Sequence, residues 1–210
     1  ITGAGRGFCA GQDLGDRNPD GEDWPPDLGH TLTAYFNPLV RLITELPMPV
    51  ICAVNGVAAG AGANLALACD MVLAAHTARF IQAFSKIGLV PDAGGSWALP
   101  NRVGLVRAMG LALTGDPLDA TEAVQWGLIW KSCPDEELMP TATALAANFA
   151  NGPTAAYAGT KSLMRAALFN SLDAHLDAEA QEQQKAGWSN DYAEGVRAFL
   201  AKRPADFTGN

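Results

Sequence analysis

The sequence contains few residues that build metal sites and has a deficit of positive charge. Its 210 residues include three histidines and four cysteines, and no C-x-x-C or H-x-x-x-H pair occurs. This spacing predicts free thiols and argues against a metal site built from protein ligands. The 14 basic and 22 acidic side chains give a net charge of −8, which leaves no electrostatic footprint for nucleic acid or an anionic membrane.

The segment 50–69 contains no charged residue and is long enough to span a bilayer. Its content does not fit a span, because Asn55, Gly60 and Asn64 interrupt the apolar run. The pattern instead predicts a buried strand over 49–54, a glycine turn with a helix beginning near Gly60, and a second strand over 70–75. A buried strand followed by a helix of small residues favours a soluble α/β protein with both faces of its sheet covered.

Helical patterns replace strand patterns in the last third of the chain. The expected helices lie near 102–113 and over 135–150, 153–169, 172–186 and 190–202, and a short strand is expected near 128–132. We therefore expect an α/β core over 1–134 and an all-helical region over 135–210. The start, Ile1-Thr2-Gly3, lacks an initiator Met and resembles the end of a strand, so we expect N-terminal core sequence to be missing. No signal-peptide pattern is present there.

The first candidate motif is the glycine-rich segment 2–14. Its spacing does not match the dinucleotide fingerprint, which needs G-x-G-x-x-G at the start of a helix, because a second turn, Cys9-Ala10-Gly11-Gln12-Asp13, follows instead. Consecutive small residues in a turn can direct unshielded backbone N–H groups at an anion. The segment is therefore either a plain tight turn or an anion-binding turn.

The second candidate motif, residues 55–64, follows the expected buried strand and begins a helix. Unpaired N–H groups at a helix start face outward, and the helix dipole favours negative charge there. Together with the first motif, it offers two backbone donors. Two such donors directed at one developing oxyanion would suit an acyl-thioester enolate or a tetrahedral intermediate.

The third candidate is Asp92, in the segment Gly88-Leu-Val-Pro-Asp92-Ala-Gly-Gly95. A lone carboxylate between proline and glycines can simply form a turn or cap a helix. It can also act as a general base whose pKa is raised by apolar surroundings. The sequence leaves both interpretations open.

In their order and spacing, these three motifs resemble the crotonase superfamily of enoyl-CoA hydratases and isomerases. The resemblance extends to the ending, residues 194–207. It implies an α/β fold in which a spiral of ββα units precedes a helical region that forms homotrimers or dimers of trimers. It also implies a cytoplasmic enzyme acting on an acyl-CoA, with no cofactor besides the coenzyme A of the substrate.

The resemblance implies a set of site residues. The backbone N–H groups of Ala10 and Ala61 would form the oxyanion hole, with Asp92 as the catalytic carboxylate. Lys202 matches a tail position that contacts coenzyme A on a neighbouring subunit, although it could equally be a solvated surface lysine. The substrate-binding residues implied in this way are Gly11, Gln12, Asp13, Gly60, Phe84, Phe199 and Lys202.

The chain departs from the hydratases of this superfamily at two positions. Hydratases add water with two glutamates, and here those positions hold Asn64 and Phe84. Asp92 instead follows Pro91, where isomerases of the superfamily carry an acidic base. One carboxylate can move a proton between two carbons through an enolate but leaves no second group to activate water. The residues therefore favour isomerisation, and Phe84 becomes either a pocket or a core side chain.

Segments 8–18, 35–40, 50–62 and 83–92 are similar to isomerases of bacterial phenylacetate degradation. This implies rearrangement of ring-1,2-epoxyphenylacetyl-CoA to its oxepin isomer and a shift of β,γ-enoyl-CoA double bonds to α,β. The stretch 12–18 is the most specific to this subgroup, with no mechanistic role assigned to Asp16 or Arg17. The alternatives are a Δ3,Δ2-enoyl-CoA isomerase of fatty acid oxidation, an aryl-CoA dehalogenase with a nucleophilic aspartate, and a non-catalytic acyl-CoA-binding module.

Overall fold

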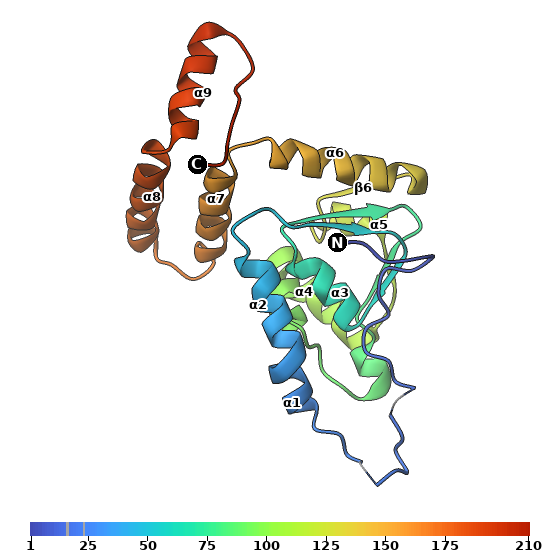
Figure 1. The fold of residues 1–210 in the computed structure, drawn as a ribbon. Coiled ribbons are helices and arrows are strands. Elements are labelled where there is room, and N and C mark those ends of the chain that lie inside the picture. The colour runs from blue at the N-terminus through green and yellow to red at the C-terminus, as the bar shows by residue number, and fades with distance from the viewer. Residues whose placement is uncertain (16, 23) are drawn as a thin grey trace. The chain divides into compact units, whose positions relative to one another are not determined.

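The computed structural model describes residues 1–15, 17–22 and 24–210, which form two compact units (Figure 1). The first unit comprises 1–44 and 50–142, and the second comprises 45–49 and 143–210. The division falls after Ala142 rather than at the expected 134 because the segment between them packs on the core. Asp135 accepts a hydrogen bond from the backbone N–H of Thr77 (3.2 Å), and Leu138 is buried.

The strands of the first unit form two three-stranded sheets. One sheet has the order β1 (Ile51–Val54), β3 (Met71–Ala75) and β6 (Lys131–Cys133), with all pairs parallel. The other has the order β2 (Val57–Ala59), β4 (Arg79–Ile81) and β5 (Leu118–Asp119), in which β4 and β5 are antiparallel. The pair β1 and β2 places one strand in each sheet before the chain enters a helix, and the pair β3 and β4 does so again. This alternation is the ββα repeat, and the expected fold class is confirmed.

The N-terminal segment follows the same two sheets in the same order. Thr2 forms a parallel bridge with Ala53 of β1, and Cys9 forms one with Ala58 of β2. The side chain of Asn55 holds the glycine loop between these bridges, because its amide donates to the carbonyl of Gly5 (2.9 Å) and accepts from the N–H of Gly3 (3.0 Å). The first motif is therefore fastened to the sheets at both ends.

The helical segments of the first unit include α1 (Leu28–Thr31), a π-helical turn (Leu32–Phe36), α2 (Asn37–Glu45), α3 (Ala61–Ala68), α4 (Gly95–Thr114) and α5 (Ala120–Gln125). Most residues of α3 are small and buried, so the helix approaches α4 closely (Figure 1). Helix α4 begins seven residues before the expected 102, and a non-helical Gly104 (φ 76°) kinks it. The helical stretch 28–45 was not expected from the sequence.

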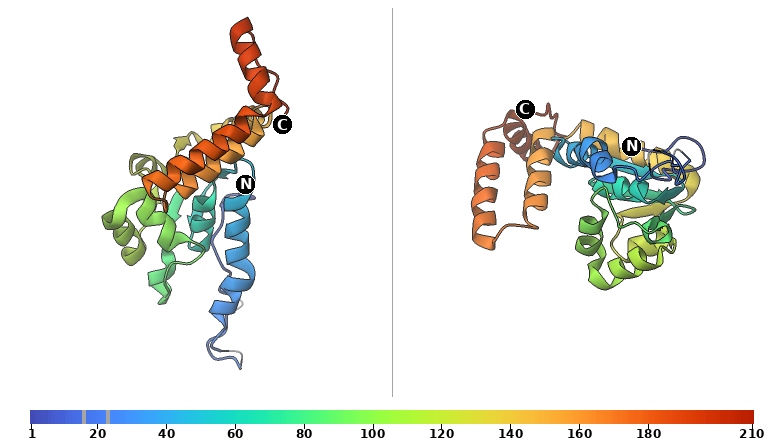
Figure 2. Two further views of the ribbon diagram at one scale, coloured as in Figure 1. Left: turned by 90° about the vertical axis from the view of Figure 1, so that its left-hand side faces the viewer. Right: turned by 90° about the horizontal axis from the view of Figure 1, so that it is seen from below.

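The described part of the second unit is all-helical, as expected. It contains most of α6 (Leu138–Ala150), then α7 (Thr154–Ala166), α8 (Leu172–Gly187) and α9 (Asn190–Ala201). Helices α7 and α8 run antiparallel and pack on each other (Figure 2). Serines placed just before two of these helices cap them, since Ser171 accepts from the N–H of Ala174 and Ser189 from that of Tyr192.

The guanidinium of Arg102 joins three backbone segments of the first unit. It donates to the carbonyls of Leu67 (2.7 Å) and Cys69 (3.3 Å) at the end of α3, and to that of Leu128 (3.1 Å). These carbonyls have no intrahelical partner, and a cation is favourable at the negative end of a helix dipole.

We therefore expect Arg102→Met to lower the free energy of unfolding by about 2–3 kcal/mol, because charged hydrogen bonds to partly buried carbonyls are lost. Urea denaturation followed by circular dichroism measures this change. The exposed Arg41→Met is the control and should change stability by less than about 0.5 kcal/mol. Equal stability of the two variants would contradict the role of Arg102.

Candidate functional site

The two glycine-containing turns lie directly against each other. The N–H of Ala59 donates to the carbonyl of Cys9 (2.9 Å). A Cβ added to Gly11 would lie 3.0 Å from the carbonyl oxygen of Ala59 and 3.4 Å from the backbone nitrogen of Ala61, and one added to Gly62 would overlap the carbonyl of Cys9. Residues 9–11 therefore pack on the segment 59–62 without intervening side chains.

This packing places two unpaired backbone donors on neighbouring segments. Among the described residues, the N–H groups of Ala10 and Ala61 have no hydrogen-bond acceptor. Ala61 is the first residue of α3, and its cap residue Gly60 provides no side-chain hydrogen bond. The helix start thus offers a free donor and the positive end of its dipole. Two such donors can stabilise one oxyanion.

Asp92 lies in the turn that precedes α4. Its backbone carbonyl accepts hydrogen bonds from the N–H of Gly95 (2.8 Å) and from Nδ2 of Asn64 (2.8 Å). The cap residue of α4 is Gly94, and no side chain caps that helix, so Asp92 does not act as a helix cap. Ala93 has a left-handed conformation (φ 46°), which costs a non-glycine residue about 1–2 kcal/mol. The turn around Asp92 is therefore strained and is held by its neighbours.

The carboxylate of Asp92 is suited to accept a proton. It is partly buried, and its Oδ1 is shielded from solvent and accepts no hydrogen bond from any described residue. Burial raises the pKa of Asp92 above its ordinary 3.8. A hydrogen bond from the residue's own backbone N–H lowers this pKa, but the effect of burial is larger. Desolvation disfavours the ionised form, so the carboxylate is a stronger base than one in water.

A pair of buried amide side chains connects α3 to the Asp92 turn. Asn64 and Gln82 are 1% and 3% exposed, and Nε2 of Gln82 donates to Oδ1 of Asn64 (2.8 Å). Position 64 stands out in the sequence for two reasons: Asn64 interrupts an apolar run, and it stands where hydratases carry a glutamate. Gln82 was not identified from the sequence. An uncharged polar residue within a helix of small apolar residues could have indicated a buried hydrogen-bonded contact, because buried amides need partners.

Phe84 lies beside the donor turn. It belongs to a short 3-10 helix (Ala83–Ile87) and is 6% exposed. Its Cζ is 3.7 Å from the position that a Cβ on Gly60 would occupy. The phenyl ring therefore packs next to Gly60, and any contact with an acyl group stays a prediction.

The remaining turn residues named from the sequence lie at the surface. Gln12 and Asp13 are exposed, and Oδ1 of Asp13 accepts from the N–H of Gly15 (2.8 Å), which stabilises the turn itself. The backbone N–H of Arg17 donates to the carbonyl of Leu14 (3.0 Å). Asp16 lies outside the described residues. Substrate contacts of Gln12 and Asp13 stay predictions.

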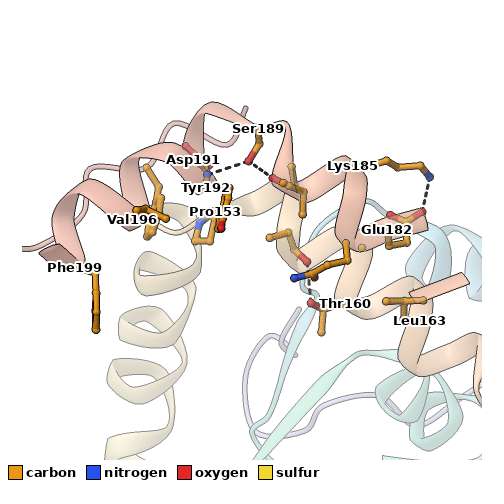
Figure 3. Close-up of a pocket in the computed structure, with 18 of the residues that line it drawn as sticks. Pro153, Thr160, Leu163, Glu182, Lys185, Ser189, Asp191, Tyr192, Val196 and Phe199 are labelled. Atoms are coloured by element: carbon orange, nitrogen blue, oxygen red, sulfur yellow. Dashed lines mark hydrogen bonds and ion pairs between the residues drawn. The ribbon is translucent and has the colours of Figure 1, made fainter. Parts of the chain in front are cut away.

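Phe199 and Lys202 belong to the second unit. Phe199 is 82% exposed near the end of α9, and Lys202 caps that helix in a left-handed conformation (φ 51°). Phe199 lines a groove of ≈ 810 Å³ formed by α7, α8, α9 and Phe207. Figure 3 shows Phe199 and Val196 on α9, and Leu163 of α7 also lines the groove. The contact of Phe199 and Lys202 with coenzyme A stays a prediction.

Within the described ranges, no three His, Cys, Asp or Glu side chains cluster as metal ligands would. The four cysteines are free thiols, three of them buried. No helix in this part of the chain combines the length and apolar character needed to cross a membrane.

The whole chain, residues 1–210, matches the enoyl-CoA hydratase/isomerase family. It is 56% identical over 209 residues to the 1,2-epoxyphenylacetyl-CoA isomerase of Escherichia coli K12, covering 100% of this chain and 80% of that protein. A Rhodobacter capsulatus protein named "probable enoyl-CoA hydratase" is 51% identical over 209 residues, which again cover 100% of this chain and 80% of that protein. A solved enoyl-CoA hydratase of Polaromonas sp. JS666 superimposes with a TM-score of 0.92 at 34% identity, covering 99% of this chain and 80% of that one.

The raised pKa of Asp92 has a consequence for stability. The ionised carboxylate is less favourable in the folded than in the unfolded protein, so folding loses stability as the pH rises through the folded-state pKa. Below pH 3.8 both states are protonated and this cost is absent. We expect Asp92→Asn to raise the melting temperature at pH 7, with a difference that shrinks as the pH falls toward 3.8. The exposed Asp177→Asn serves as control, and an equal rise in both variants would contradict the assignment.

Proposed function

The chain belongs to the enoyl-CoA hydratase/isomerase family, and within it we propose an acyl-CoA isomerase that rearranges ring-1,2-epoxyphenylacetyl-CoA to its oxepin isomer and shifts β,γ double bonds to α,β. The observation that supports this most is Asp92, a carboxylate with a raised pKa and a free Oδ1, tied through Asn64 to the helix whose start offers the Ala61 donor. The name of the 56% identical Escherichia coli relative supports the choice of substrate.

The proposed reaction begins with the thioester carbonyl between the N–H groups of Ala10 and Ala61. Asp92 removes a proton from the α carbon, and the C–H electron pair moves into an enolate whose oxygen the two donors stabilise. Each donor contributes ~2.7–4 kcal/mol to such a barrier. Asp92 then returns the proton to the γ carbon, and the double bond moves into conjugation. A phenylacetyl thioester also has a CH₂ group α to its carbonyl, so the same enolate step can begin the ring rearrangement.

The residues at positions 64 and 84 favour isomerisation over hydration. Hydration needs a second group that activates water, and Asn64 and Phe84 supply an amide and a phenyl ring at the two positions where the resemblance expects glutamates. Neither group accepts a proton from water at neutral pH. A lone aspartate would also suit an aryl-CoA dehalogenase, in which the carboxylate attacks an aromatic carbon.

The remaining parts of the proposal concern cofactor and assembly. Proton transfer and oxyanion stabilisation need only groups of the protein, so we propose no cofactor besides the coenzyme A of the substrate. We also propose a cytoplasmic homotrimer or dimer of trimers. The exposed apolar side chains along α9 support such an association, because apolar surface gathered on one helix is typical of interfaces. They are Tyr192, Val196, Phe199 and Leu200.

We expect the protein to convert a β,γ-enoyl-CoA to its conjugated isomer, measured as the rise in conjugated-enoyl absorbance. Asp92→Asn should lower kcat by roughly 10²–10⁴-fold, because the general base is lost. The wild-type rate should fall as the pH drops through the raised pKa of Asp92, since only the ionised carboxylate accepts a proton. Asp177→Asn should keep the wild-type rate.

The same assay separates the alternatives. Near-full isomerase activity in Asp92→Asn would refute the proposed base. Halide release from an aryl-CoA would favour the dehalogenase instead, and acyl-CoA binding without turnover would favour the non-catalytic module. Comparison of the phenylacetyl epoxide with aliphatic enoyl thioesters distinguishes the ring isomerase from an isomerase of fatty acid oxidation.

The two donor turns can be tested with a pair of glycine variants. Gly62→Ala would place a Cβ on the carbonyl of Cys9 and push the Ala10 turn away from Ala61, whereas Gly110 in α4 has nothing within 4 Å of an added Cβ. We expect Gly62→Ala to lower kcat by roughly 100-fold, as loss of one oxyanion donor does. Gly110→Ala should retain activity and gain up to about 1 kcal/mol of stability. Equal activity of both variants would exclude the proposed oxyanion hole.

A further inference from the structure

We propose that Asn64, oriented by Gln82, is a positioning residue that sets the Asp92 carboxylate at a fixed place relative to the oxyanion turn. The inference rests on the proposed function, in which Asp92 is the base. Neither amide contacts the reacting atoms in this proposal. They act on catalysis only through the backbone of Asp92.

The supporting contacts form a continuous chain across three segments. Gln82, directly after β4, donates from Nε2 to Oδ1 of Asn64 (2.8 Å) on α3, and Nδ2 of Asn64 donates to the carbonyl of Asp92 (2.8 Å) before α4. Both amides are almost completely buried, at 1% and 3% exposure. Buried hydrogen bonds of this kind hold their partners firmly, because breaking one leaves a desolvated polar group unpaired.

The carbonyl of Asp92 and the amide of Gln82 hold the Asn64 amide from its two sides. An asparagine side chain presents an acceptor on one side and donors on the other. The carbonyl of Asp92 accepts from Nδ2, which leaves Oδ1 for the donor from Gln82. Without Gln82, Oδ1 of Asn64 would be buried with no partner, and the amide that holds the Asp92 turn would be held less firmly.

Asn64 and the backbone donor Ala61 lie on the same short helix, α3. Ala61 is the first residue of α3, and Asn64 follows three residues later, about one helical turn away. Gly95, after the Asp92 turn, packs so closely on the Asn64 amide that an added Cβ would overlap it. The turn that carries the base is thus attached to the helix whose first residue is the Ala61 donor.

The point of attachment preserves the basicity of Asp92. A donor bonded to the carboxylate would stabilise its ionised form and lower its pKa. Asn64 bonds to the backbone carbonyl instead, and Oδ1 of the carboxylate keeps no hydrogen-bond partner among the described residues. A neutral amide also adds no charge beside the base. The turn is held while the carboxylate stays free to take a proton.

The test replaces each amide by leucine, which has similar size and no hydrogen-bonding groups. We expect Asn64→Leu to lower kcat by about 100-fold and Gln82→Leu by roughly 10-fold, with KM changed less than about twofold, because misplacement of a catalytic group affects the chemical step. The double variant should match Asn64→Leu, since Gln82 acts through Asn64. Asn101→Leu is the matched control, because Asn101 is exposed on α4 and its amide also donates to a backbone carbonyl, that of Trp97 (2.9 Å).

A second readout needs no substrate. The pKa of Asp92 can be measured by nuclear magnetic resonance of its carboxyl carbon. We expect a pKa above 3.8 in the wild type and in Asn101→Leu. In Asn64→Leu and Gln82→Leu the pKa should lie closer to 3.8, because the released turn gains water.

If Asn64→Leu does not fold, Gln82→Leu decides alone, since Asn64 remains in place. An unchanged titration in the folded amide variants would overturn the proposal, as would a loss confined to KM. Absence of isomerase turnover in the wild type would refute the proposed function, while the titration would still decide whether the amides position Asp92.

Discussion

The close approach of residues 9–11 to the start of α3 is the constraint on which the site depends. The two segments belong to successive strand pairs of the spiral, and they meet because glycine at 62 leaves room for the carbonyl of Cys9. The hydrogen bond from Ala59 to Cys9 fixes their spacing. Any larger residue at 62 would separate the N–H groups of Ala10 and Ala61. A pair of free donors on adjacent backbone segments is therefore a product of backbone packing, with no contribution from side-chain chemistry.

The raised pKa of Asp92 comes from a different physical effect, the burial of its carboxylate. No neighbouring charge accounts for the raised pKa of Asp92, which follows from burial in an apolar turn. This turn is held by hydrogen bonds to its backbone carbonyl and includes a strained Ala93. The donors of Gly95 and Asn64 thus act on the main chain, while desolvation acts on the carboxylate and outweighs the hydrogen bond from the residue's own N–H. The two effects are compatible because they act on different atoms of the same residue.

The helices were the most predictable part of the fold. The expected segments 153–169, 172–186 and 190–202 agree with α7, α8 and α9 within three residues at each end, because serine caps and glycine or proline breaks mark their limits. Asp119 likewise caps α5, by accepting from the N–H of Glu122. The sheet of β2, β4 and β5 escaped prediction because strands of two or three residues show no measurable alternation.

The sequence by itself determined the family, the ββα core with its helical region, and the identities of the chemically important residues: an aspartate at 92, and no carboxylate at 64 or 84. The residue identities are visible in the chain directly, and the family with its ββα core follows from the resemblance that its motifs carry. Only the tertiary structure decided what Asn64 does, and that Gln82 takes part at all. Asn64 lies 28 positions from Asp92 and 18 from Gln82. Contacts over such separations depend on how α3 packs between β4 and the start of α4, and side-chain hydrogen bonds of this kind leave no periodic pattern in the sequence.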